Sequence, residues 1–341
     1  MRVTRETLIR LAKETAQERA FNDKSIIAAY LTGSLLTEEP FLGGVTDIDL
    51  VLVTSGKPPR SREIVPLTPD FHIDISYRPK SDYQPPRELR VNPWLGYEIY
   101  DPMLLLESQH FFEFTQAAVR AGFEFHAPAL VLTRCRKLLE HGRQIWFDLM
   151  DVGENAGPKE VAKYLKSLYH AACAIAELHG PPLPERRLLL LFPGLAEQAG
   201  RPGMSAGLLG LLGGAGLEAS TLEGWLAGWA STFKAGFESG KADPRIHTAR
   251  LNYYQKCFQA MLGGDDPTVM LWPLLSTWTF AAVALPAEAT QPWQEACAHL
   301  GLTGDRFAER VQGLDHYLDE IEMLLDEIAA ANGLETSNSL P

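Results

Sequence analysis

The spacing of hydrophobic residues changes once along this chain of 341 residues, and that change limits the folds open to it. Residues 26–78 contain short apolar runs, some strictly alternating and bounded by glycine and proline, as is typical of β-strands. From about residue 109 almost to the end, apolar residues recur at steps of three and four, as in amphipathic helices. The pattern predicts an α+β protein in which a sheet-containing domain is followed by an all-α helical bundle.

The apolar runs also place the elements of the first domain. Strands are expected over residues 26–32, 47–53 and 71–77. Residues 4–20 have helical spacing among Arg, Lys and Glu, which predicts an amphipathic helix lying over the sheet. The long connection 56–69 could carry one further short strand.

The boundary between the domains is expected near residue 108, where the period changes. This gives a first domain over 1–108, a helical domain over 109–330 and a disordered tail over 331–341. The last predicted helix has a short apolar seam from Val311 to Ile328, which we interpret as packing within the same chain.

Composition narrows the function classes. Hydrophobic residues make up 46% of the chain and charged residues 22%, as in folded globular proteins. Acidic residues outnumber basic ones 43 to 31, so long DNA or RNA is not an expected partner. The sequence contains no run of 18 apolar residues and no signal-peptide core, so we expect a cytoplasmic protein without a membrane partner. The four cysteines are widely separated and form no metal or redox motif.

Three aspartates alternate with apolar residues in two of the expected strands. Because side chains alternate between the faces of a strand, Asp47 and Asp49 point to the same side. In residues 71–77 the same rule places Asp74 opposite the apolar side chains. If the two strands are neighbours, the three carboxylates converge on one face.

Clustered carboxylates repel one another unless cations hold them together, and their oxygens suit Mg²⁺ with phosphate as a further ligand. One or two such ions can activate an attacking oxygen and neutralise a departing pyrophosphate. The Gly33-Ser34 turn after the first strand would offer backbone N–H groups and a hydroxyl to a phosphate. We therefore predict that a triphosphate binds between this turn and the metal.

In order and spacing, Gly33-Ser34, the Asp47-Ile-Asp49 triplet and the later Asp74 resemble the DNA polymerase beta-like nucleotidyltransferase superfamily. The resemblance covers only about residues 26–78. It implies a small mixed sheet flanked by helices, with catalytic and metal-binding roles for the three aspartates and phosphate binding at Gly33 and Ser34. The helical domain that follows is similar in architecture to that of the small-molecule, aminoglycoside-type nucleotidyltransferases.

The resemblance implies a Mg²⁺-dependent enzyme that transfers a nucleoside monophosphate to a hydroxyl of a small-molecule acceptor and releases pyrophosphate. ATP is the expected co-substrate and AMP the group transferred. The alternative is a nucleotide-binding regulatory or antitoxin-like module that modifies or binds a protein partner. The sequence carries no signature of the acceptor or of an oligomeric state.

Two further roles are suggested by the same resemblance. A phosphate-binding lysine is expected early in a helix of the second domain, which makes Lys163 and Lys166 candidates for nucleotide binding. A glutamate acts as general base in the antibiotic-modifying relatives, and here Glu98 and Glu107 are both open candidates.

Overall fold

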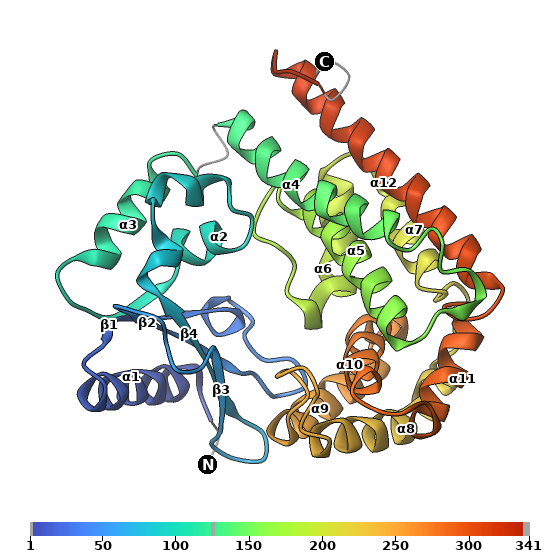
Figure 1. Ribbon diagram of the computed structural model, residues 1–341, viewed down its shortest axis with the longest axis horizontal. Helices are drawn as coiled ribbons and strands as arrows, with labels where there is room; N and C mark the ends of the chain where they lie inside the picture. Colours follow the sequence, from blue (N-terminus) through green and yellow to red (C-terminus); the bar gives the residue numbers. More distant parts are fainter. Residues whose placement is uncertain (1–2, 124–126, 337–341) are drawn as a thin grey trace. The chain divides into compact units, whose positions relative to one another are not determined.

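The computed structural model describes residues 3–123 and 127–336, and it divides the chain into two compact units (Figure 1). The first unit comprises residues 1–124 together with 249–260, and the second comprises 125–248 and 261–341. Each unit is described by itself below.

A five-stranded sheet forms the centre of the first unit, in the order β3-β4-β2-β1-β5. The strands are β1 (Ile26–Thr32), β2 (Ile48–Thr54), β3 (Arg62–Pro66), β4 (His72–Pro79) and β5 (Met103–Glu107). Strands β2 and β4 are parallel, whereas β1 pairs antiparallel with β2 and β5, and β3 antiparallel with β4. The sheet is therefore mixed, as expected.

Helices cover both faces of this sheet. The apolar stripe of α1 (Arg5–Asn22) packs on the face that carries Leu50 and Ile75. On the other face, α2 (Leu95–Tyr100) and α3 (Phe111–Arg120) pack against a second core. The alternation predicted around the aspartates is confirmed, because Ile48, Leu50, Leu52, Phe71, Ile73 and Ile75 lie in the core under α1. Val51 and Val53 of β2 lie in the core on the other face.

The helix α9 (Leu251–Leu262) belongs almost entirely to the first unit, although it lies far along the chain. Its aromatic side chains Tyr253, Tyr254 and Phe258 are buried. Gly43 allows the 38–46 loop to approach it, because a Cβ on Gly43 would lie 2.3 Å from the Lys256 carbonyl oxygen. A segment of the predicted helical domain is therefore part of the sheet-containing unit.

The second unit is helical, and residues 127–336 contain no β-strand. Its helices are α4 (Pro128–Phe147), α5 (Pro158–Ala176), α6 (Leu188–Gln198), α7 (Gly203–Leu211), α8 (Ala219–Glu238), α10 (Leu271–Val283), α11 (Gln291–Leu300) and α12 (Arg306–Ala331). The predicted seam of α12 is buried from Val311 to Leu325, and this helix packs on α4 and α5 of the same chain. No helix in the described part of the chain is long and apolar enough to cross a membrane.

Three features differ from the domain limits expected from the sequence. The edge strand β5 was not predicted, and α3 packs on the sheet core, so the first unit continues past residue 108. Segment 249–260 also lies in this unit rather than with the helical domain. In the predicted tail, residues 331–336 finish α12 and its C-cap turn, with a bond from the Leu334 N–H to the Ala329 carbonyl; residues 337–341 lie outside the described range.

Candidate active site

The predicted glycine turn and the three aspartates lie at the edge of the sheet where β1 ends and β2 and β4 begin. In the parallel pair, Asp49 lies directly opposite Asp74. Thr32, the last residue of β1, is paired with Asp49 on the other side. Gly33 follows immediately, so the glycine turn and the two aspartates are neighbours. Asp47 directly precedes β2 and is 8% exposed.

Gly33 has the backbone geometry that the site requires of a glycine. Its φ is +78°, a conformation that other residues adopt only with strain. A Cβ at this position would lie 2.0 Å from the Asp49 Oδ2 atom. The carboxylate of Asp49 therefore lies directly against the backbone of the turn. A residue with a side chain at position 33 would clash with it. Ser34 begins a short 3₁₀ turn (Ser34–Leu36), and its hydroxyl lies 3.0 Å from the Thr46 hydroxyl.

Asp74 is buried and ion-paired with two arginines. Arg62 in β3 donates from Nε to Oδ1 at 2.7 Å and from Nη2 to Oδ2 at 2.5 Å, a bidentate arrangement. Arg250 donates from Nη2 to the same Oδ2. The Asp74 side chain is only 2% exposed and that of Arg250 only 5%. The Nη2 atom of Arg250 also lies 4.0 Å from Asp47 Oδ2.

Arg250 is fixed because the helix that follows it is attached to the sheet at several points. Asn252 and Lys256 both donate to Asp70, the Lys256 Nζ at 2.6 Å. The rings of Tyr253 and His72 meet edge to face, with centroids 5.2 Å apart. His72 is fully buried on this face as a neighbour of the site.

Sequence reasoning missed Arg250. The aromatic run of residues 251–258 indicates a buried helix, but nothing in it identifies the unit in which the helix is buried. Arg250 and Asp74 are 176 residues apart in the chain.

A metal ion needs ligand atoms that lie close together, so the spacing of the carboxylates matters for the predicted site. Among the described residues, the group of three whose ligand atoms all lie within 4.8 Å of one another is Glu107, His110 and Glu113. Asp47, Asp49 and Asp74 share a face but do not form such a group, in keeping with the engagement of Asp74 by two guanidinium groups. Their assignment as ligands stays a prediction.

The Glu107 group forms the start of α3. Glu107 Oε2 accepts hydrogen bonds from the backbone N–H groups of Phe112 and Glu113, at 2.9 and 3.3 Å. The Glu113 carboxylate accepts a hydrogen bond from His110, which raises the pKa of that imidazole. Glu107, an open candidate for general base, thus caps a helix.

Glu98, the other candidate base, lies in a buried polar network. It accepts a 2.6 Å hydrogen bond from the Tyr30 hydroxyl and a 2.6 Å bond from Arg78 Nη2. Arg78 lies four residues beyond Asp74 in β4, a distance of about 13 Å along a strand. Burial raises the pKa of Tyr30 well above its usual value, and the charge of Glu98 raises it further. This network stabilises the packing of α2 rather than placing a base at the aspartates.

Both candidate lysines belong to α5 of the second unit, so the first unit does not contain them. Lys163 donates from Nζ to the exposed Asp148 carboxylate at 3.1 Å. The charge of Lys166 contributes to a lowered pKa at His141 and His170, although burial is the larger cause for both. Their role in phosphate binding stays a prediction.

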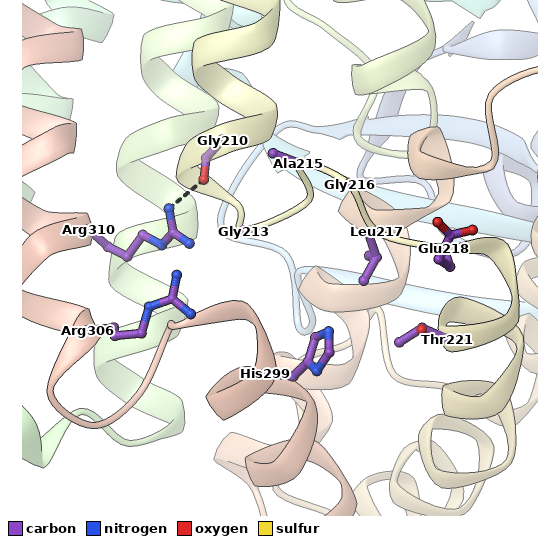
Figure 2. Close-up of a pocket in the computed structure, with 10 residues that line it drawn as sticks. All are labelled: Gly210, Gly213, Ala215, Gly216, Leu217, Glu218, Thr221, His299, Arg306 and Arg310. Carbon is purple, nitrogen blue, oxygen red and sulfur yellow. Dashed lines mark hydrogen bonds between the residues drawn. The ribbon is translucent and has the colours of Figure 1, made fainter.

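The second unit contains a cavity of about 580 Å³, lined by the glycine-rich turn after α7 and by His299, Arg306 and Arg310 (Figure 2). Arg310 donates to the carbonyl oxygens of Gly210 and Leu300, at 2.6 and 2.9 Å. It therefore joins α7 and α11 by binding carbonyls at their C-terminal ends. The turn itself is tightly packed, because a Cβ on Gly213 would lie 2.2 Å from the Leu300 carbonyl oxygen.

Comparisons with known proteins add little to this geometry. No family model matches the sequence, and neither does any curated protein. Among solved structures, the chain is similar to a nucleotidyltransferase-like protein from Exiguobacterium sibiricum 255-15, with 11% identity, 98% of this chain and 96% of that chain covered, and a TM-score of 0.28. Because that TM-score is so low, the interpretation of the site depends on its own residues.

Proposed function

We propose that the first unit is a Mg²⁺-dependent nucleotidyltransferase domain that transfers a nucleoside monophosphate from a nucleoside triphosphate to a hydroxyl group. The observation that carries the proposal is the contact of the Asp49 carboxylate with the Gly33 turn, beside Asp74 on the parallel strand. Phosphate-binding backbone and metal-binding oxygens are needed side by side for this chemistry.

Asp47 and Asp49 are the residues that would hold Mg²⁺, since they stand two positions apart at the start of β2. The ion supplies Lewis acidity and charge neutralisation at the phosphates. The Gly33-Ser34 turn would bind the triphosphate through backbone N–H groups and the Ser34 hydroxyl. The acceptor oxygen attacks the α-phosphorus, the bond to the bridging oxygen breaks, and pyrophosphate leaves with the bonding electrons. The hydroxyl proton is released to a base or to water.

We further propose a small molecule as acceptor and ATP as donor. The net charge of −12 favours a cationic small molecule over a nucleic acid, because long phosphate chains bind concentrated basic surfaces. Aminoglycosides, which carry many hydroxyl and ammonium groups, are the first acceptors to test.

The test is direct incubation with each of the four α-labelled nucleoside triphosphates, Mg²⁺ and a panel of hydroxylated metabolites and antibiotics. The expected result is pyrophosphate release, together with an acceptor whose mass increases by one nucleoside monophosphate. The Asp49→Asn variant is the matched control, since it keeps the side-chain shape and removes the charge. Triphosphate binding without turnover across the panel, or with transfer only onto a protein, would instead support the regulatory module.

A further inference from the structure

The third aspartate is not arranged as a metal ligand. Both Asp74 oxygens accept from guanidinium groups, Oδ1 from Arg62 and Oδ2 from Arg62 and Arg250. The side chain is 2% exposed, so no open side remains for an ion and its waters. Mg²⁺ needs near-octahedral coordination and keeps several waters, which a carboxylate enclosed in this way cannot accommodate.

Arg250 is held in place because the helix that follows it, α9, is fixed on the sheet. The two bonds to Asp70, the ring contact between Tyr253 and His72, and the close approach at Gly43 all fix α9 on the sheet. A guanidinium group stays charged at every physiological pH, so the site carries a permanent cation beside Asp74 and 4.0 Å from Asp47.

A second divalent ion would have to approach this fixed cation. Paired ions in two-metal sites lie about 3.5–4 Å apart and share carboxylate oxygens. Here the region between Asp47 and Asp74 is occupied by the Nη2 atom of Arg250. Two like charges this close repel strongly where water is excluded, so an ion held between Asp47 and Asp74 would compete with this guanidinium for the same place.

We propose that the site binds one divalent ion, on Asp47 and Asp49, and that Arg250 supplies the positive charge for which a two-metal enzyme uses its second ion. Asp74 is then a positioning residue, which holds the charges of Arg62 and Arg250 at the site, with Arg250 4.0 Å from Asp47. This inference depends on the proposed nucleotidyltransferase function, because it assigns the cations of that reaction.

The test counts Mn²⁺ ions per bound triphosphate. The wild-type protein, in slight excess over an ATP analogue that cannot be cleaved between the α and β phosphorus atoms, is titrated with Mn²⁺ while the free ion is followed by electron paramagnetic resonance. The titration is expected to end at one equivalent per analogue, and this ion should be bound more tightly than it is by the analogue without protein. An end point at two equivalents would overturn the inference and leave the proposed function intact, whereas failure to bind the analogue would overturn both.

The number of Mn²⁺ ions bound by variants distinguishes a metal ligand from a residue that only positions an arginine. Asp49→Asn is expected to lose protein-dependent Mn²⁺ binding, whereas Asp74→Asn keeps one ion per analogue. Arg250→Gln should raise the Kd for the analogue about tenfold or more, with partial recovery in Arg250→Lys. The matched control is Arg19→Gln, because Arg19 pairs with Glu63 on the opposite face of the sheet and should leave the Kd unchanged.

An Asp74→Asn protein that loses the ion as completely as Asp49→Asn would show that Asp74 is a ligand. An Arg250→Gln protein that binds the analogue as well as the wild type does would show that Arg250 carries no share of the phosphate charge. Circular dichroism of each variant checks its fold, and the count on the wild-type chain stands even if a variant does not fold.

Discussion

Each unit of this protein buries an arginine–carboxylate group, and the two groups differ in how the charges are balanced. In the first unit, Asp74 is held by two guanidinium groups that use both of its oxygens. In the second unit, Glu177 of the α5 C-cap accepts a hydrogen bond from Arg134 Nε at 3.1 Å, with both side chains fully buried. Burial raises the pKa of Glu177 to about 8, and the nearby Arg134 charge opposes this rise without cancelling it.

The difference shows what each group contributes. The Glu177 pair lies in a helical core, where desolvation outweighs attraction, so the pair adds little stability and breaking it is costly. In the Asp74 group two guanidinium groups contact one carboxylate, and Arg250 also lies 4.0 Å from Asp47. The Glu177 pair joins α4 to α5, whereas we propose that the Asp74 group takes part in ligand binding.

Replacing Arg134 by Met should give the largest loss of stability. The change leaves Glu177 buried without its cation, which costs about 3–5 kcal/mol when that carboxyl is ionised. Urea unfolding at pH 9 measures the loss, and at pH 5 the loss should be smaller because Glu177 is then protonated. A double variant, Arg134→Met with Glu177→Leu, should recover most of it. Equal losses at both pH values would contradict the account.

Glu177 should also make wild-type stability depend on pH. Its folded pKa of about 8 lies above the unfolded value near 4.5, so the folded state binds more protons between these values. The free energy of unfolding should therefore fall as pH rises through this window, by about 4 kcal/mol from pH 5 to pH 9. Glu177→Gln should remove this part of the slope. If denaturant melts of the two proteins give parallel pH profiles, Glu177 does not titrate in this window.

Gly33→Ala tests the first unit through activity. The added Cβ would lie 2.0 Å from Asp49 Oδ2, so the carboxylate or the turn must move. We expect kcat/KM to fall about a hundredfold, since a misplaced ligand loses several kcal/mol of transition-state stabilisation. Stability should fall by only about 1–2 kcal/mol, the cost of the positive φ. Gly44→Ala, at a second positive φ with open space around it, is the control for backbone strain. Similar activities for the two variants would remove Gly33 from the site.

Lys163→Gln should have the smallest effect on stability. Its ion pair with Asp148 is exposed on both sides, and such pairs contribute about 0–1 kcal/mol. If Lys163 binds phosphate, the KM for the triphosphate should rise while the melting temperature stays the same. Lys166→Gln is the parallel variant. A lysine whose replacement leaves the KM for the triphosphate unchanged does not bind the nucleotide.

The sequence predicted the sheet and the placement of the aspartates because both follow from alternation within single strands. The side of Asp49 is fixed by Ile48 and Leu50, and that of Asp74 by Ile73 and Ile75. The edge strand β5 escaped prediction because MLLLE shows no alternation and all five side chains are only half-buried. Register between strands was a supposition until the structure paired Asp49 with Asp74.

The position of α9 and the contact of Arg250 with Asp74 could not be predicted, because they depend on contacts between segments far apart in the chain. A helical stripe such as that of residues 251–262 looks the same whether it packs on a sheet or in a bundle. The position of α9, and with it the arrival of Arg250 at Asp74, is decided by the Asp70 bonds and the close approach at Gly43. For the same reason Glu98 and Glu107 remained candidate bases until their partners in the fold were known.

Thermal melting can show whether Asp49 holds a metal that helps to bind a nucleoside triphosphate. Wild type and Asp49→Asn are melted with and without Mg²⁺ and an ATP analogue that cannot be cleaved. Removing one of several neighbouring carboxylates should raise the melting temperature of the ligand-free variant slightly, or leave it unchanged. Mg²⁺ with the analogue should raise the melting temperature of wild type by several degrees and that of Asp49→Asn by much less, since only the ligand-binding state is stabilised. Equal shifts in the two proteins would mean that Asp49 holds no metal.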